Sequence, residues 1–157
     1  MIVYRIVRED LATLDGKGAA EYPGRWNKHD VPCVYTSASP SLAQLEKMVN
    51  VDDWKIFITI PHLILCIEVP DNKVHEISES DLPPGWDNAV YSLETQEMGT
   101  NLLNNPSVTA FSIPSAVSKM ERNIILNPRS SDYAARVKAV EKIPFEFDAG
   151  LLKGKLS

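Results

Sequence analysis

The stretch Gly24-Arg25-Trp26-Asn27, followed by Val34-Tyr35-Thr36-Ser37 and then by Leu45-Glu46, organises the chain. It places a guanidinium, a phenol and a carboxylate on three successive elements, which suits a small polar ligand. Arg25 is a planar donor fork fitted to phosphate or carboxylate oxygens, although a surface arginine is the simpler explanation of a lone Gly-Arg pair. Trp26-Asn27 favours the ligand, because a loop gains little from a large aromatic residue unless it anchors something.

Local patterns predict the elements that carry the phenol and the carboxylate. Residues 33–36 have the composition of a short buried strand, so Tyr35 is either a core residue or a ligand contact. Ser39-Pro40 is typical of an N-cap followed by a first-turn proline, which predicts a helix over residues 40–50. The apolar stripe of this helix is expected at Leu42, Leu45 and Val49.

Glu46 is the most informative of these residues because it lies beside that expected stripe. Its carboxylate leans towards the core face of the helix, where a charge is costly unless it is paired or hydrogen-bonded. Glu46 therefore needs a partner or faces a cleft. The alternative is a boundary residue paired with Lys47 or another surface charge.

Composition describes an ordinary globular chain. Its 157 residues suit one domain, and 44% hydrophobic with 24% charged residues is typical of such a domain. The net charge of −5, without a basic tract, disfavours direct nucleic-acid binding. The apolar runs 56–60 and 63–67 are too short to span a bilayer, and the N-terminal residues lack a signal-peptide pattern.

The two cysteines, Cys33 and Cys66, both lie in apolar runs. Buried free thiols in a cytoplasmic protein are the simplest explanation, with a disulfide as the alternative, and their separation gives no metal motif.

Hydrophobic periodicity predicts a mixture of short elements. Strands are expected at residues 2–7, 54–60, 63–69, 108–113 and 121–126, helices at 88–103 and 132–141, and an extended stretch at 143–147. The long polar segment 8–30 is expected to be a functional loop or a lid. Because strands and helices do not alternate regularly, we predict a single α+β domain with a mixed or antiparallel sheet and flanking helices. That domain would span residues 1–149, followed by a frayed tail at 150–157.

Well-known catalytic motifs do not explain this chain. Residues 16–20 begin like a dinucleotide fingerprint, but Glu21 replaces the third glycine and no helical pattern follows. No P-loop, no Gly-x-Ser-x-Gly elbow and no His-Glu-x-x-His motif occurs. His29, His62 and His75 are scattered and are interpreted as surface residues. A metal site and a serine triad are therefore both disfavoured.

Gly-Arg-Trp-Asn, Val-Tyr-Thr-Ser and Ala-x-Leu-Glu, in this order near the N-terminus, resemble the RES domain family, which is named for its arginine, glutamate and serine. The serine would be Ser115, for which a turn or cap serine is the alternative. Residues 121–123 and 126–128 fit the same pattern. The resemblance extends from residues 4–5 to residues 145–148.

The resemblance implies an ADP-ribosyltransferase-like fold and the toxin of a type II toxin-antitoxin system. Such toxins consume NAD by hydrolysis or phosphorolysis, or modify a protein target, with NAD as substrate and no metal or other cofactor. The implied partner is a cognate antitoxin with a Cro/repressor-like helix-turn-helix that covers the active site, and a homodimer within the complex is compatible with this. Arg25, Tyr35, Glu46 and Ser115 match the family's functional positions.

Four further residues are candidates for substrate binding: Arg5, Trp26, Asn27 and Asn123. Arg5 is expected on the opposite face of its strand from Tyr4, where it is either a second anion ligand or a solvated residue.

This set of side chains suits cleavage of the bond between nicotinamide and ribose, because nicotinamide leaves as a neutral base without a general acid. Glu46 would orient the ribose and stabilise positive charge, Arg25 would hold phosphate, Tyr35 would pack on nicotinamide and Ser115 would donate a local hydrogen bond. The acceptor stays open among water, phosphate and a protein. The alternative of another class is a catalytically silent module that binds a nucleotide or an antitoxin.

Overall fold

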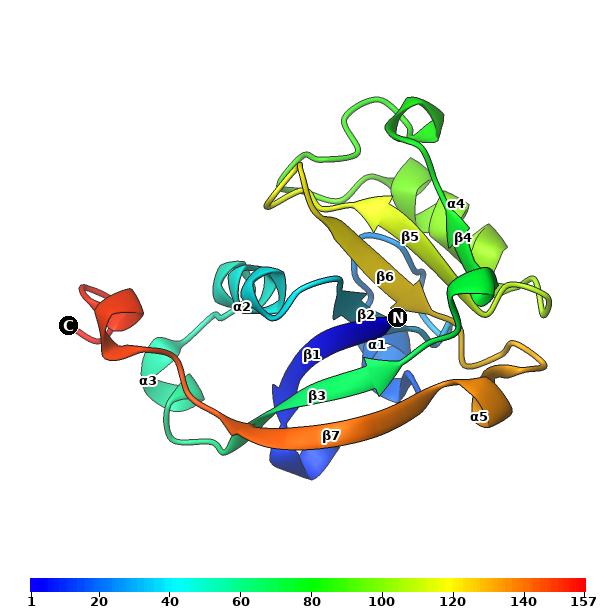
Figure 1. The fold of residues 1–157 in the computed structure, drawn as a ribbon. Helices are drawn as coiled ribbons and strands as arrows, with labels where there is room; N and C mark the ends of the chain where they lie inside the picture. The colour runs from blue at the N-terminus through cyan, green and yellow to red at the C-terminus, as the bar shows by residue number, and fades with distance from the viewer.

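Seven strands form one sheet in the order β4-β5-β6-β2-β1-β3-β7 in the computed structural model, which describes residues 1–157 (Figure 1). All neighbouring strands are antiparallel except β4 and β5, which run parallel. The strands are β1 (Ile2–Arg8), β2 (Val34–Ser37), β3 (His62–Glu68), β4 (Val74–Glu76), β5 (Ala110–Pro114), β6 (Arg122–Leu126) and β7 (Lys138–Phe145). The predicted α+β domain with a mixed sheet is confirmed.

Five helices flank this sheet: α1 (Lys17–Glu21), α2 (Pro40–Val49), α3 (Trp54–Phe57), α4 (Leu93–Leu103) and α5 (Tyr133–Arg136). Figure 1 shows α4 beside β4 and β5, whereas α2 packs against β1 and β2. Short 3-10 turns lie at Glu9–Leu11, Asp71–Lys73, Glu79–Asp81 and Ala149–Leu152. None of the helices is both long and apolar enough to cross a lipid bilayer.

The sheet opens between β1 and β2. These strands are joined by one residue pair, Tyr4 with Ser37, whereas β1 pairs with β3 along its whole length. Figure 1 accordingly shows β1, β3 and β7 as one half of the sheet and β4, β5 and β6 as the other. On the side of β2, most of β1 therefore lies beside an opening in the sheet and not beside a hydrogen-bonded strand.

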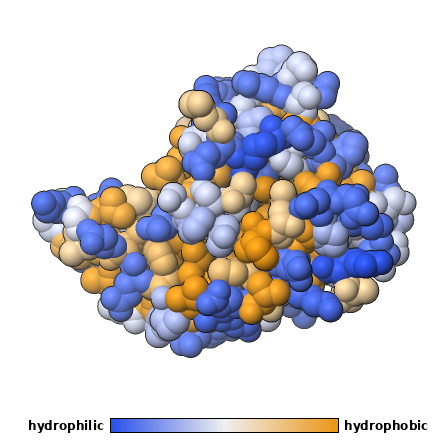
Figure 2. Space-filling model, in the orientation of Figure 1, coloured by the Kyte–Doolittle hydropathy of each residue, from blue (hydrophilic) through white to orange (hydrophobic).

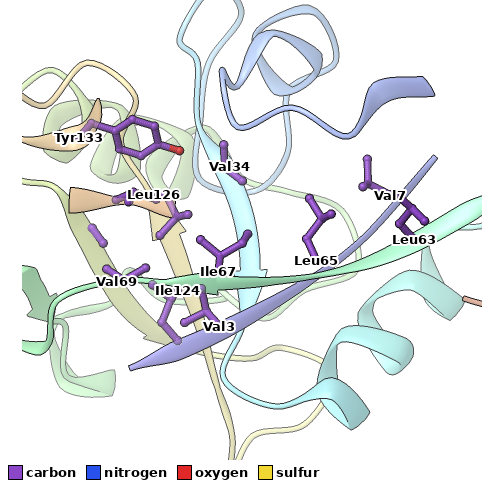
Figure 3. Packing of buried hydrophobic residues seen from close by; sticks show 12 residues of the cluster. Val3, Val7, Val34, Leu63, Leu65, Ile67, Val69, Ile124, Leu126 and Tyr133 are labelled. Carbon is purple, nitrogen blue, oxygen red and sulfur yellow. The ribbon is translucent and has the colours of Figure 1, made fainter. Parts of the chain in front are cut away.

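A buried apolar cluster joins the two halves of the sheet on one face. Val3, Leu65 and Ile67 from β1 and β3 pack with Ile124 and Leu126 from β6, and each of the five is 1% exposed or less (Figure 3). Full burial of such side chains stabilises the fold by about 1.5–3 kcal/mol each. These contacts hold the halves together although β1 and β2 hardly pair.

A second cluster covers the other face of β5 and β6. Ile125 points away from Ile124 and packs with Phe111, Leu103 of α4 and Trp26. Because both faces of the second half of β6 are buried, Ile124, Ile125 and Leu126 form a continuous apolar run rather than an alternating pattern. The Trp26 loop is thereby attached to the core.

Helix α2 begins as the sequence predicts, with the Ser39 hydroxyl accepting a hydrogen bond from the Leu42 amide at 3.1 Å. Its expected apolar stripe is wrong, because Leu45 and Val49 are 42% and 62% exposed while Leu42 and Ala43 are buried. The face towards the sheet therefore continues from Leu42 and Ala43 to Glu46, at the spacing of one helical turn. This places the carboxylate deeper than the predicted stripe implied.

The predicted strand over residues 54–60 is wrong, because Trp54–Phe57 form α3. The Asp53 carboxylate accepts hydrogen bonds from the amides of Lys55 and Ile56, at 2.8 and 3.2 Å. This N-cap and the packing of Trp54 outweigh the strand preference of the aromatic and β-branched residues.

The predicted helix over residues 132–141 is correct only for its first turn. After α5, residues from Lys138 onwards form β7, which pairs with β3 as the edge of the sheet. Almost every residue of β7 is exposed, so no alternation of apolar and polar residues marks the strand. Its backbone pairing with β3 decides its conformation.

Three smaller differences concern loops and ends. Helix α4 begins at Leu93 rather than at residue 88, since the Ser92 hydroxyl caps it by accepting from the Thr95 amide. The predicted loop 8–30 contains the short helix α1, and strand β4 was not predicted. In the C-terminal tail, Lys155 lies 5.4 Å from the centroid of the Trp54 ring.

Candidate functional site

A cavity of about 870 Å³ lies where the sheet opens. Its walls come from β1, β2 and α2, from the loop before Trp26, and from segments 87–91 and 114–117. Cavities of roughly 300–1,000 Å³ are typical of small-molecule sites. Figure 2 shows the surface hollowed between the C-terminal segment and the lobe that contains β5 and β6. Six of the eight predicted site residues line the cavity: Arg5, Arg25, Trp26, Tyr35, Glu46 and Asn123.

The Glu46 carboxylate is held by one of its two oxygens. Oε1 accepts hydrogen bonds from Ser115 Oγ at 2.8 Å and from Asn123 Nδ2 at 2.5 Å. No protein donor lies within hydrogen-bond distance of Oε2. Glu46 therefore has a fixed orientation and one free oxygen at a cavity wall, which confirms the expectation that it needs partners.

Ser115 follows directly after β5 and is fully buried. Its Oγ accepts from the amides of Val117 and Ser118, both at 3.0 Å, so its own proton is directed to Glu46. This hydrogen bond joins two residues that lie 69 positions apart in the chain. Ser115 does not line the cavity, so it acts on a ligand only by positioning Glu46.

Asn123 of β6 is oriented by a residue that sequence reasoning did not select. Ser37 Oγ donates to Asn123 Oδ1 at 2.9 Å, which leaves the Asn123 amide nitrogen directed at Glu46. Ser37 and Asn123 are also paired across β2 and β6. The sequence feature that could have indicated this contact is Ser37, the last residue of the Val-Tyr-Thr-Ser stretch.

Tyr35 holds the loop that carries Arg25, Trp26 and Asn27, which is called the arginine loop below. Its hydroxyl donates to Asn27 Oδ1 at 2.7 Å and accepts from the Trp26 amide at 2.9 Å. Burial raises the pKa of Tyr35 well above its ordinary value, so the phenol stays neutral. A Cβ at Gly24 would lie 2.7 Å from this hydroxyl, which explains the glycine before Arg25.

Asn27 does not contact the cavity, contrary to the prediction that it binds substrate. Its fully buried amide donates to the carbonyls of Ala19 and Val31 at 2.7 and 3.0 Å, and its Oδ1 accepts from Gly24 and Tyr35. Every strong hydrogen-bonding position of the side chain is therefore used inside the loop. Asn27 organises the loop instead of meeting a ligand.

Arg25 is partly occupied by the protein. Its Nη1 donates to the carbonyl oxygens of Trp86 and Asn88, at 2.5 and 2.7 Å. The guanidinium lies 4.8 Å from the centroid of the Tyr91 ring. Arg25 thus fastens segment 86–91 to the cavity wall, and only Nε and Nη2 remain for a ligand.

Two further cations line the cavity, Arg5 of β1 and Lys47 of α2. Burial is the main cause that lowers the pKa of each group, and the charge of Arg5 lowers the pKa of Lys47 further. Sequence analysis did not select Lys47. With Arg25 these residues place three positive charges around the cavity, against the two acids Glu46 and Asp87, in a chain whose net charge is −5.

The remaining titratable groups contribute little to this site. None of the three histidines lines the cavity, and no cluster of three or more His, Cys, Asp or Glu side chains could hold a metal ion. Both cysteines are free, and burial raises the pKa of the cavity residue Cys33 to about 12. The arrangement can stabilise a developing positive charge at Glu46 and hold an anion beside it.

Comparisons with known proteins match this chain to one protein family. The RES domain model matches residues 2–148. The Toxin Res of Photorhabdus laumondii is 33% identical over 157 residues, with 99% of each chain covered. The Prs ADP-ribosylating toxin of a Sphingobium species is 27% identical over 143 residues, which cover 89% of this chain and 87% of that protein.

A solved structure shares the fold. It is a chain of the crystal structure of the M. tuberculosis MbcT-MbcA toxin-antitoxin complex, with a TM-score of 0.67, 14% identity, and coverage of 99% of this chain and 88% of the other. The family match spans nearly the whole chain and includes every element that builds the cavity. The protein therefore belongs to the RES domain family.

Proposed function

We propose that this protein is the toxin of a toxin-antitoxin pair and that it consumes NAD by breaking the bond between nicotinamide and ribose. The observation that carries the proposal is the Glu46 carboxylate, with Oε1 fixed by Ser115 and Asn123 and Oε2 free at the cavity wall. A fixed negative charge in a half-enclosed site stabilises positive charge better than a mobile one in water.

The chemistry follows from the substrate. The nicotinamide nitrogen of NAD is positively charged while it is bonded to C1′ of the ribose. When that bond breaks, the electron pair goes to nitrogen and nicotinamide leaves neutral, so no proton donor is required. The positive charge passes to the ribose, where Glu46 stabilises it. Water or phosphate then bonds to C1′, and attacking water releases its proton to solvent.

The surface around the cavity supports an antitoxin partner. Four exposed apolar side chains line the cavity: Tyr22, Val49, Tyr91 and Val117, with exposed fractions of 76%, 62%, 40% and 38%. Exposed apolar residues gathered around a hollow are typical of protein interfaces. We propose that a cognate antitoxin with a helix-turn-helix covers this opening and that any DNA contact belongs to the antitoxin.

Transfer of ADP-ribose to a protein is the second candidate. The relative that is named an ADP-ribosylating toxin favours it, because that protein is similar over most of both chains. The same Glu46 geometry serves both reactions, and only the acceptor differs. A catalytically silent binding module would bind NAD without releasing nicotinamide.

The test is nicotinamide release from NAD by the purified, partner-free protein, with and without phosphate, followed by chromatography. We expect Glu46→Gln to lower kcat by about 100-fold or more, the scale for loss of an electrostatic stabiliser. The matched control is Glu97→Gln, since Glu97 is a 64% exposed carboxylate on α4 outside the cavity. This control should keep full activity.

The co-product identifies the acceptor. Free ADP-ribose indicates hydrolysis, and a phosphorylated ADP-ribose formed only in phosphate indicates phosphorolysis. Absence of release by a folded protein would rule out both. NAD labelled in its adenosine half would then be added to a cell lysate: a labelled protein supports transfer, and NAD binding without turnover supports the silent module.

A further inference from the structure

We propose that Glu121 is a positioning residue for the Glu46 carboxylate. Glu121 fastens residues 115–121, the β5–β6 turn, to the start of α2, and the same turn holds Glu46 through Ser115. The proposal rests on the proposed function, because the reaction that it serves is the one proposed for Glu46. Glu121 does not line the cavity, so it acts only through the residues that it holds.

Glu121 is a half-buried carboxylate that takes part in no ion pair. Both of its oxygens are bound by serine hydroxyls instead. Ser39 Oγ donates to Oε1 at 2.6 Å, and Ser118 Oγ donates to Oε2 at 3.1 Å. These hydroxyls replace part of the hydration that the carboxylate loses on burial. Glu121 is therefore fixed between two segments, one of which lies 82 positions earlier in the chain.

The two serines connect Glu121 to Glu46 along both sides of a closed ring. On one side, Ser39 is the N-cap of α2, and Glu46 follows it by about two turns of the helix. On the other side, the Ser118 amide donates to Ser115 Oγ at 3.0 Å, and Ser115 Oγ donates to Glu46 Oε1 at 2.8 Å. The β5–β6 turn is thus attached to α2 at two points, the cap and the carboxylate.

Two attachments restrain the helix more than one attachment does. With the Ser115 contact alone, the N-terminal end of α2 could shift on the sheet, and the free Oε2 of Glu46 would move with it. The packing of Leu42 and Ala43 does not prevent such a shift, because apolar contacts have no preferred direction. Stabilisation of a developing charge depends on a preset position, so the hold on the helix start matters to the reaction.

A purely structural role for Glu121 makes a different prediction. Its loss would then lower the Tm and leave the kinetic constants of the folded protein unchanged. The backbone of the turn does not need the carboxylate, since the Ser115 amide donates to the Glu121 carbonyl and the Glu121 amide to the Ser118 carbonyl, both at 2.9 Å. Glu121→Ala is therefore expected to fold.

The test measures kcat and KM for nicotinamide release from NAD by Glu121→Ala, at a temperature at which the variant is folded. We expect kcat to fall by about 10- to 100-fold, the scale for a misplaced catalytic group, with KM within about twofold of wild type. The matched control is Glu141→Ala, which removes an exposed carboxylate of β7 outside the cavity and should keep both constants. A wild-type kcat in folded Glu121→Ala would overturn the proposal.

Two more measurements establish the route through Ser115. Ser115→Ala removes the hydroxyl that joins the turn to Glu46, so adding Glu121→Ala to it should change kcat by no more than about twofold. Effects that multiply would show that Glu121 acts independently of Ser115 and would overturn the proposal.

Glu121→Gln is the conservative variant. Its amide oxygen accepts from Ser39, and its amide nitrogen donates to Ser118 Oγ, because a hydroxyl also accepts. This variant should retain kcat within about threefold of wild type. A loss as large as that of Glu121→Ala would contradict the hydrogen-bonded ring.

Ser118→Ala keeps the proposal falsifiable if Glu121→Ala does not fold. It removes one hydrogen bond of the ring and leaves the Ser118 amide and the Ser39 cap in place. Its kcat should fall by about 3- to 10-fold, the scale of one hydrogen bond. A wild-type kcat in this variant would equally overturn the proposal.

Amide hydrogen exchange separates failure of this proposal from failure of the proposed reaction. The amides of Val117 and Ser118 donate to Ser115 Oγ, and their exchange should be faster by about fivefold or more in Glu121→Ala and unchanged in Glu141→Ala. Faster exchange in a protein whose wild type releases no nicotinamide would support the ring and reject the reaction. Release that depends on Glu46, with unchanged exchange and unchanged kcat in Glu121→Ala, would support the reaction and reject the ring.

Discussion

Replacing Gly99 with alanine tests how α4 holds the arginine loop. A Cβ at Gly99 would lie 2.0 Å from the carbonyl oxygen of Trp26, which is backbone and cannot rotate away. On the same helix face, Gln96 Nε2 donates to the Gly24 carbonyl and Thr100 Oγ1 accepts from the Lys28 amide, both at 3.0 Å. The helix and the loop must separate to admit the methyl group, and this stretches both hydrogen bonds.

The magnitude follows from three contributions. Overpacking costs about 1–3 kcal/mol, and two weakened hydrogen bonds cost about 0.5–1.5 kcal/mol each. Alanine stabilises the helix by about 0.5–1 kcal/mol relative to glycine, because its helix propensity is higher. A net loss of about 2–4 kcal/mol would lower Tm by about 5–15 °C for a domain of this size.

The assay is thermal unfolding followed by circular dichroism, with Gly18→Ala as the control. Gly18 also lies in a helix, but nothing lies within 4 Å of a Cβ placed there. That control should keep its Tm or gain about 1–3 °C, since alanine reduces the entropy of the unfolded chain. A Gly99→Ala protein that melts within about 2 °C of wild type would refute the close approach of α4 to the loop.

Two further predictions concern the buried hydroxyl group of Tyr35 and the buried thiol of Cys33. Tyr35→Phe leaves the Trp26 amide without its acceptor and Asn27 with one donor fewer. Urea unfolding should therefore show a free energy of unfolding that is lower by about 1–3 kcal/mol. The control is Tyr22→Phe, which changes an exposed ring, and an equal loss of stability in that variant would contradict the prediction. The pKa of Cys33 rises to about 12 from the ordinary value of 9.0, so the unfolded chain loses this proton first as pH rises. Stability should therefore fall above pH 9 by up to about 1.4 kcal/mol per pH unit, and Cys33→Ala should flatten this slope; identical slopes would exclude the assignment.

Several elements could be predicted because their causes are local. Ser39-Pro40 caps and starts α2 through contacts within four residues, and β1 and β3 are short strands of mainly β-branched and other apolar residues. Glu46 could be recognised as a carboxylate in need of partners from the helical period alone. The family resemblance named Ser115 and Asn123 as candidate site residues, but only the structure shows that they are the partners of Glu46.

Other elements could not be predicted because distant contacts decide them. Strand β7 pairs with β3 although residues 138–141 have a helical pattern, and the exposed edge leaves no periodic signal. Lys47 was overlooked because sequence position alone places it on the outer face beside Glu46. The role of Arg25 depends on the carbonyls of Trp86 and Asn88, which lie more than sixty residues away.

The sequence by itself determined the fold class and the residue types that the cavity brings together. The fold class could be predicted because helix caps and strand propensities act within a few neighbouring residues, and the residue types could be predicted from the ordered motif series along the chain. Only the tertiary structure decided that the sheet opens between β1 and β2 and leaves Arg5 unpaired at the opening. Strand pairing and the loss of hydration depend on what the rest of the chain places beside a residue, and no local pattern records that.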